Sequence, residues 1–211
     1  MIPKHQVHNL IILDESGSMQ SIKDNIIQGF NETVQTVKGI AEQYPEQEHL
    51  ITFVTFNGFG QKVLHFIDSV EKLEQIDASK YHPEANTPLY DAMGFSFSKL
   101  SKALKKVKNY NVLVTIMTDG EENASKEYTG VAIKKLIEEL KQNRWTFTYI
   151  GTDHDVEKFA ATISITNTMK FEKNTESMRY MFEKEKYARE MYSQKIRNKE
   201  STTDNYYEEE K

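Results

Sequence analysis

Three short segments of the sequence carry side-chain oxygens that could bind a hard metal ion. The first is Asp14-x-Ser16-x-Ser18, and the other two contain Thr87 and Asp119. Two carboxylates together with neutral hydroxyls suit Mg²⁺, which keeps several of its waters when it binds a protein. Mn²⁺ and Ca²⁺ are alternatives, although Ca²⁺ usually takes more carboxylates. No histidine or cysteine belongs to this set of residues, which disfavours zinc.

Each segment has a simpler interpretation when it is taken alone. Ser16 or Ser18 could cap a helix, because serine is a favoured N-cap residue. Thr87 followed by Pro88 is a common helix start, and Asp119-Gly120 is a common turn. All three segments, however, are expected at the carboxyl end of one sheet, where ligands bind in open α/β folds. Because coincidence is the harder explanation, the sequence predicts a metal site there.

The elements that must position these residues are short apolar strands alternating with amphipathic helices. Apolar runs bounded by turn residues indicate buried strands, and apolar residues at steps of three and four indicate helices. Strands are expected at residues 7–13, 50–56, 62–67, 112–117, 145–150 and 168–171. Helices are expected at residues 22–44, 89–107, 131–140, 156–163 and from about 175. The alternation predicts an α/β fold with a doubly wound, mostly parallel six-stranded sheet and helices on both faces.

One connection predicts an exception to the parallel order. Asn57-Gly58-Phe59-Gly60 joins two strands, and Asn-Gly supplies the positive φ angles that a tight hairpin needs. The strand at residues 62–67 should therefore be antiparallel and lie at an edge of the sheet. The glycines do not form a dinucleotide-binding motif, because a third glycine and a following helix are missing.

The chain shows no linker and no internal repeat, so residues 1–195 are expected to form one domain. From about residue 196 the sequence becomes polar and charged, and it ends Tyr-Tyr-Glu-Glu-Glu-Lys. This composition predicts a flexible tail over residues 196–211, and deletion from about Asn198 onward should leave folding and metal binding intact.

The overall composition excludes several classes of function. The 211 residues carry a net charge of −5, so neither nucleic acid nor a membrane surface is an expected partner. The absence of cysteine excludes disulfides and cysteine nucleophiles. The polar N-terminus runs into an apolar segment that is too short for a signal peptide or a membrane span, which favours a cytoplasmic protein.

The spacing of Asp14, Ser16 and Ser18, with Thr87 before a helix and Asp119 after a strand, resembles the metal-ion-dependent adhesion site of the von Willebrand factor type A (VWA) domain family. The order of elements resembles that family over residues 7–192. The resemblance implies a Rossmann-like sheet in which Asp14 and Asp119 lie side by side. It also implies that Ser16 and Ser18 bind the ion directly, and that Thr87 and the two aspartates bind it directly or through water.

The loops around this site predict an acidic rim, formed by Glu15, Glu121, Glu122 and Asp153. Many VWA domains continue with Gly-x-Gly after the strand at residues 145–150, whereas this sequence has Gly-Thr-Asp-His-Asp at residues 151–155. Asp153 or Asp155 could add a second cation there, but an acidic residue more often caps a helix. We therefore do not assign a second metal site.

Two classes of function remain open. The resemblance implies a non-catalytic module in which a carboxylate of a protein partner completes the coordination of a bound Mg²⁺ ion. The acidic rim favours a partner whose acidic residue is flanked by Lys or Arg. The alternative is a metal-dependent phosphatase-like hydrolase, but that chemistry needs a second aspartate where this chain has Ser16, and no lysine is evidently placed to complete the site. No catalytic residue is assigned.

Overall fold

The structure, a computed structural model, describes residues 4–152, 154–203 and 205–207. Within these residues, six strands form one sheet in the order β3-β2-β1-β4-β5-β6. The strands are β1 (His5–Asp14), β2 (Gln47–Asn57), β3 (Gly60–Ser69), β4 (Tyr110–Met117), β5 (Trp145–Gly151) and β6 (Asn167–Lys170). All neighbouring pairs are parallel except β2 and β3. The predicted fold is confirmed, including the antiparallel edge strand.

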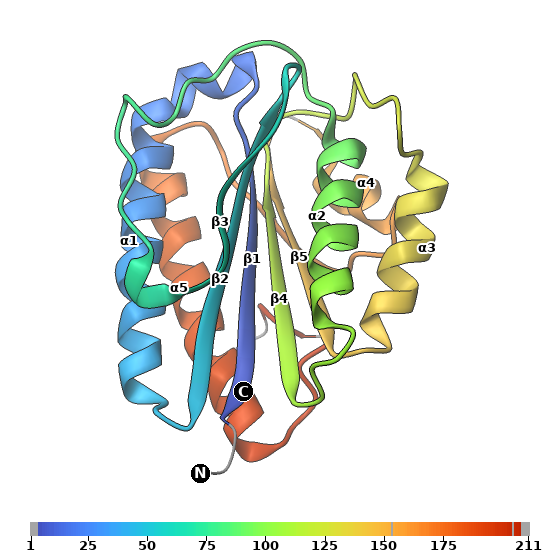
Figure 1. Ribbon diagram of the computed structural model, residues 1–211. Coiled ribbons are helices and arrows are strands. Elements are labelled where there is room, and N and C mark those ends of the chain that lie inside the picture. The colour runs from blue at the N-terminus through green and yellow to red at the C-terminus, as the bar shows by residue number, and fades with distance from the viewer. Residues whose placement is uncertain (1–3, 153, 204, 208–211) are drawn as a thin grey trace.

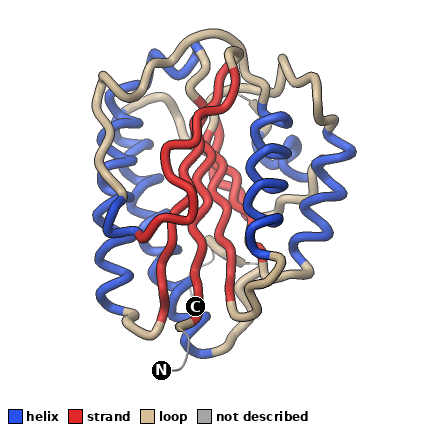
Figure 2. Tube along the Cα trace, viewed as in Figure 1, coloured by secondary structure: helices blue, strands red, loops and turns tan. Residues whose placement is uncertain are grey.

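Helices cover both faces of this sheet (Figures 1 and 2). Helices α1 (Lys23–Gln43) and α5 (Thr175–Asn198) pack side by side on one face. Helices α2 (Leu89–Leu104), α3 (Gly130–Lys141) and α4 (Val156–Thr162) cover the other. Two short 3₁₀ helices, η1 (Gly17–Ile22) and η2 (Val70–Lys72), complete the described elements. None of the described helices is both long enough and apolar enough to cross a membrane.

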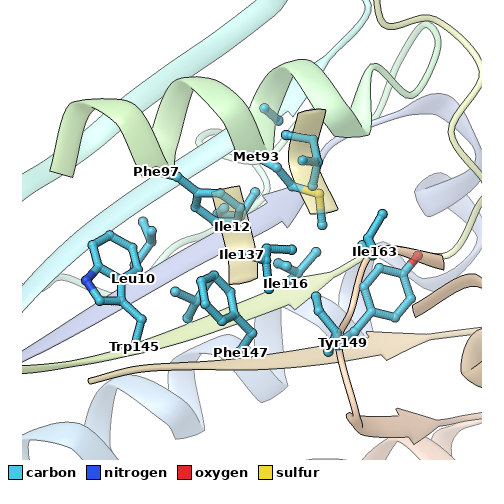
Figure 3. Packing of buried hydrophobic residues seen from close by; sticks show 14 of the residues in the cluster. Leu10, Ile12, Met93, Phe97, Ile116, Ile137, Trp145, Phe147, Tyr149 and Ile163 are labelled. Carbon is cyan, nitrogen blue, oxygen red and sulfur yellow. The ribbon is translucent and has the colours of Figure 1, made fainter. Parts of the chain in front are cut away.

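The apolar run in β1 is continuous because both faces of the strand are buried. Leu10 and Ile12 pack toward α2, α3 and α4, where Phe97 and Phe147 meet edge to face with ring centroids 5.3 Å apart (Figure 3). Ile11 belongs to the cluster that includes residues of α1 and α5. A strand covered on both sides reads as apolar at every position rather than at alternate ones. This pattern identified β1 from the sequence.

The sheet has its topological switch point between β1 and β4. These strands are parallel neighbours, with Leu13 opposite Met117. From β1 the chain continues to α1 on one face, whereas from β4 it continues to α3 on the other. The loops after the two strands therefore lead to opposite faces, which is the arrangement at which ligands bind in open α/β sheets. Asp14 and Asp119 lie at this point.

The hairpin between β2 and β3 forms as expected, but Asn57 and Gly58 do not adopt the positive φ angles that we expected. Of its residues, only Gly60 has a positive φ, of 131°. The Asn57 side chain instead accepts a hydrogen bond from the backbone N–H of Phe59 at 3.0 Å, which closes the turn. A Cβ atom at Gly58 would lie 2.9 Å from the backbone nitrogen of Asn86. Gly58 is therefore required by close approach to the loop that carries Thr87, not by its φ angle.

The segment after residue 195 has contacts that its polar composition did not indicate. Helix α5 continues to Asn198, and Lys199 then adopts a left-handed conformation (φ 61°) that turns the chain back. Thr202 and Tyr206 are buried, and the Thr146 hydroxyl donates a 2.7 Å hydrogen bond to the carbonyl of Thr202. The described part of the predicted tail thus packs on the domain, because a few aromatic and polar groups find buried partners there.

Two buried histidines predict a loss of stability in acid. His8 and His49 are 2% and 5% exposed, and burial lowers the pKa of each to about 4. Glu46 raises the pKa of His49, whereas Arg189 and His5 lower it further. In the unfolded chain both titrate near pH 6.5, so between pH 6.5 and 4 the unfolded state binds more protons and stability falls as the pH falls.

We expect each histidine to cost roughly 1–2 kcal/mol of stability between pH 7 and pH 5. Urea unfolding of the parent and of the double variant His8→Gln/His49→Gln should measure this contribution, because the comparison removes the effect of other titrating groups. The variant should show a shallower dependence on pH. Equal slopes for the two proteins would contradict the assignment.

Candidate metal site

The two predicted carboxylates lie at the carboxyl edge of the sheet, at the top of Figure 1, and both are buried. Asp14 is the last residue of β1, and its Oδ1 accepts a 2.7 Å hydrogen bond from the backbone N–H of Ser16. Asp14 Oδ2 accepts a 2.6 Å bond from the Thr118 hydroxyl, which precedes Asp119. Asp119 Oδ1 in turn accepts a 2.6 Å bond from the hydroxyl of Ser18. Hydrogen bonds thus connect the loops after β1 and β4.

The three predicted hydroxyls face this same space. Ser16 Oγ and Ser18 Oγ lie 3.3 Å apart. A Cβ atom at Gly120 would lie 3.7 Å from Ser18 Oγ and 3.9 Å from Thr87 Oγ1, so Gly120 keeps the centre of the cluster free of a side chain. The structure therefore brings together the residues that the spacing predicted: Asp14, Ser16, Ser18, Thr87 and Asp119.

These hydroxyls do not cap helices, which was their simpler interpretation. Ser16 precedes η1 but makes no side-chain capping hydrogen bond. The N-cap position of α1 is Ile22, four residues beyond Ser18, the last residue of the motif. The N-cap position of α2 is Pro88 rather than Thr87, and it also lacks a side-chain cap. Helix capping therefore does not explain why serines and a threonine stand at these positions, whereas a bound ligand would.

The loops that carry the site are held by hydrogen bonds within the protein. The Tyr81 hydroxyl donates to the carbonyl of Asp14 at 2.6 Å, and Tyr81 is fully buried. Thr87 and Asn123 exchange two bonds: the Thr87 N–H donates to Asn123 Oδ1 at 3.0 Å, and the Asn123 N–H donates to the Thr87 carbonyl at 3.2 Å. Asp91 in α2 accepts three backbone N–H bonds from residues 126–128. The site is therefore pre-organised.

The predicted acidic rim is smaller than the sequence suggested. Glu15 is 1% exposed and lies beneath the rim, where its carboxylate contacts Lys62 Nζ at 3.3 Å and accepts the His82 N–H at 2.6 Å. Glu122 is half-buried and accepts hydrogen bonds from the first turn of α2 and from residues 124 and 125. Glu121 is exposed. Asp153 lies outside the described residues.

The other acidic residue of the loop after β5, Asp155, caps a helix, as we expected. Asp155 is the N-cap residue of α4, and its Oδ1 accepts a 3.1 Å hydrogen bond from the Lys158 N–H.

One group of the site was not found from the sequence. Lys173, in the loop between β6 and α5, places its Nζ 2.8 Å from Asp119 Oδ2. The Lys173 side chain is 24% exposed and that of Asp119 is fully buried. No lysine was evident from the sequence to complete a phosphatase-like site, but the structure places Lys173 beside Asp119. Lys173 follows Asp119 by 54 residues and carries no motif, so only the folded chain shows the contact.

The electrostatics of the cluster favour a bound cation. Burial raises the pKa of Asp14 to about 6, and the nearby Asp119 carboxylate raises it too, whereas hydrogen bonds from Thr118 and Ser16 oppose these effects. Asp119 Oδ2 makes no hydrogen bond of acceptable geometry within the described residues, although Lys173 contacts it. The two buried carboxylates, with Asp119 Oδ2 lacking a hydrogen bond from the described residues, suit a divalent ion. In the described residues no three His, Cys, Asp or Glu side chains cluster, so the hydroxyls are essential to the donor set.

The sequence matches the family model of the von Willebrand factor type A domain over residues 10–194, and the chain therefore belongs to this family. A search of curated proteins with the sequence finds no match.

Solved structures show the same fold. The pilus adhesin SpaC from Lactobacillus rhamnosus GG matches with a TM-score of 0.62 and 12% identity, over 89% of this chain and 30% of that one. The vWF domain of the type V pili tip protein Mfa5 from Porphyromonas gingivalis matches with a TM-score of 0.59 and 10% identity, over 86% and 95% of the two chains. The SpRpn10 VWA domain matches with a TM-score of 0.56 and 13% identity, over 84% of this chain and 94% of that one.

Some of the matching proteins are much longer than this chain, so the likeness covers only part of them. This chain covers 46% of proximal thread matrix protein 1 from the mussel byssus, with a TM-score of 0.55 and 14% identity. At such identities the likeness shows the fold alone. VWA domains generally serve as protein-interaction modules, and this chain has the scaffold of such a module.

Proposed function

We propose that this protein is a divalent-metal-dependent, non-catalytic binding module that recognises a carboxylate of a protein partner in the cytoplasm. The observation that carries the proposal is the cluster of three hydroxyls and two buried carboxylates at the switch point, none of whose hydroxyls caps a helix. Oxygen ligands of this kind suit Mg²⁺, and Mn²⁺ or Ca²⁺ could replace it.

The ion would be held by Asp14, Ser16, Ser18, Thr87 and Asp119. When bound, it supplies a centre of positive charge to which an outside oxygen can coordinate. Because three of the five ligands would be neutral hydroxyls, the ion would stay electrophilic, and a partner's carboxylate would gain a strong charge-assisted contact.

The surroundings of the site support a partner with basic residues beside its acidic one. Glu84 and Glu121 are exposed in the two loops that flank Thr87 and Asp119. A purely acidic partner would meet these charges at a cost of up to about 1 kcal/mol each at close range in water. Lys or Arg residues next to the coordinating carboxylate would instead be attracted. Nucleic acid and a membrane surface are not proposed as partners, because the net charge of −5 repels both.

Metal binding should stabilise the folded protein. We expect Mg²⁺ or Mn²⁺ to bind with a stoichiometry of one and to add about 2.7 kcal/mol of stability at a free concentration 100 times Kd. For a domain of this size that corresponds to a rise of roughly 5–10 °C in Tm. Calorimetric titration and melting scans with MgCl₂ or EDTA would measure both quantities.

The matched variants are Asp14→Asn and Asp119→Asn. Each should abolish the Mg²⁺-dependent rise in Tm. In EDTA, Asp14→Asn should melt no lower than the parent, because a buried carboxylate is replaced by a neutral group of the same shape. Asp119→Asn should melt lower, because it also removes the counter-charge of Lys173. The Thr118 hydroxyl can turn from Asp14 to the Gly120 carbonyl, 3.1 Å away. Unchanged metal affinity in both folded variants would show that the site is assigned incorrectly.

The partner is testable by metal-dependent capture. Protein retained on the immobilised chain in Mg²⁺ and released by EDTA should bind less well to Glu121→Lys at low salt, and the difference should shrink as salt screens the charge. Glu122 is unsuitable for this test because its carboxylate holds the first turn of α2. Capture that EDTA does not reverse would contradict the role of the metal.

A phosphatase-like hydrolase remains the second candidate, since Lys173 does lie at the site. The residues do not favour it: Ser16 stands where a second aspartate would be needed, and both oxygens of Asp14 already accept hydrogen bonds. An assay with an aryl phosphate decides between the two. Metal-dependent turnover that Asp14→Asn abolishes would establish the enzyme.

A further inference from the structure

The contact between Lys173 and Asp119 places a positive charge at the candidate metal site. Asp119 is 1% exposed, and its two oxygens have different partners: Oδ1 accepts the Ser18 hydroxyl at 2.6 Å, and Oδ2 lies 2.8 Å from Lys173 Nζ. Oδ2 is buried and makes no hydrogen bond of acceptable geometry within the described residues, so the ion pair with Lys173 is its contact there. The ammonium group thus contacts one of the two buried carboxylates that a bound cation would use.

The backbone around Lys173 is held in place from both sides. Phe171 is 1% exposed, and its N–H donates to the Gly151 carbonyl at the end of β5 at 3.1 Å. On the other side, Asn174 caps α5 by accepting the Ser177 N–H at 2.9 Å, and the Ser177 hydroxyl accepts the Glu172 N–H at 2.9 Å. The four-carbon side chain of lysine is flexible, but its starting point beside the site is fixed.

A buried carboxylate needs a partner of opposite charge, and an ammonium group and a divalent ion both satisfy that need. They cannot both contact Asp119 Oδ2, because two cations within a few Å of each other repel strongly where water is excluded. We propose that Lys173 is a built-in counter-ion that competes with the divalent ion for Asp119 and so sets the metal affinity of the site. This inference rests on the proposed metal-binding function.

The competition has a definite thermodynamic consequence. A site that is free of the lysine for only a fraction of the time binds the ion with an apparent Kd raised by the inverse of that fraction. Removing the ammonium group should therefore tighten metal binding. It should also lower the stability of the protein in EDTA, because Asp119 then loses its counter-charge.

The test compares Lys173→Met and Lys173→Gln with the parent and with Lys170→Met. Lys170 is the last residue of β6 and is exposed, so its variant makes the same change in net charge three residues away. Titration calorimetry with MgCl₂ and MnCl₂ would measure Kd, and melting scans in EDTA would measure stability; circular dichroism checks folding. We expect the Lys173 variants to bind at least tenfold more tightly and to melt several degrees lower in EDTA, and Lys170→Met to match the parent in both.

The outcomes separate this inference from the proposed function. If the parent binds metal and both Lys173 variants bind it equally or more weakly, the competition is overturned and the metal site stands. If the variants bind metal and the parent does not, the competition is supported and the metal dependence proposed for the parent fails. If no protein binds either ion, both proposals fall. Weaker stability of Lys170→Met in EDTA, equal to that of Lys173→Met, would also overturn the specific role of Lys173.

Discussion

Replacing Arg189 with methionine is expected to lower the free energy of unfolding by about 3–5 kcal/mol, because it leaves a buried carboxylate without its counter-charge. Arg189 Nε lies 2.9 Å from Glu185 Oε1 inside α5, and both side chains are 3% exposed. The guanidinium group also donates to Asn9 Oδ1 at 3.2 Å and to the Thr115 hydroxyl at 2.6 Å, which joins α5 to the centre of the sheet. Urea unfolding would measure the loss.

The same helix offers a matched control for this experiment. Arg179 and Glu183 have the same i,i+4 spacing, but their side chains are 70% and 66% exposed. Arg179→Met should cost no more than about 0.5 kcal/mol, because an exposed pair is screened by water. The double variant Glu185→Leu/Arg189→Met should recover part of the stability, since it leaves no buried charge. Equal effects of Arg179→Met and Arg189→Met would contradict the proposed importance of burial.

Ending the chain at Lys199 is the second change with a large expected effect. The removed segment contains Tyr206, which is 5% exposed and whose hydroxyl donates to Glu185 Oε1 at 3.3 Å, and Tyr207, which donates to Glu185 Oε2 at 2.9 Å. Burying an aromatic side chain contributes about 2–3 kcal/mol, and a hydrogen bond to a charged group contributes about 1.5–3 kcal/mol. We expect the truncated chain to lose about 4–6 kcal/mol, measured by urea unfolding.

The full-length variant Tyr206→Phe/Tyr207→Phe separates the two causes of this loss. It keeps the apolar contacts and removes only the hydroxyls, so it should lose less stability than the truncated chain. Metal affinity should be unchanged in both, because the segment contacts Asn111, Thr146 and Asn167 near the amino ends of their strands, opposite the metal site. An unchanged urea midpoint for the truncated chain would instead support the flexible tail that the composition predicts.

The site and this segment lie at opposite ends of the same strands, and both depend on neighbouring loops being held in place. At the metal end, Tyr81 holds the carbonyl of Asp14, and Asn123 holds the backbone of Thr87. These residues would contact no metal ligand atom directly, yet they fix the geometry in which the side-chain oxygens face each other. Pre-organisation of this kind lowers the cost of assembling a binding site.

The sequence by itself determined the order of strands and helices, because the apolar period of each element depends on residues that are close in the chain. It also determined the antiparallel edge strand, from a loop of two residues between β2 and β3. It predicted the five candidate ligands because each directly follows a strand or precedes a helix, so its place at the sheet edge follows from the order of elements alone.

Only the tertiary structure decided which other side chains reach that edge. Lys173 meets Asp119, Lys62 meets Glu15, and Tyr206 meets Glu185 across gaps of 21 to 54 residues. Such pairs depend on how loops and helices pack, so they cannot be predicted from the spacing of apolar residues along the chain. The final segment shows the same limit. Its composition is polar because most of its side chains face water, but two tyrosines with buried partners suffice to fix it on the domain.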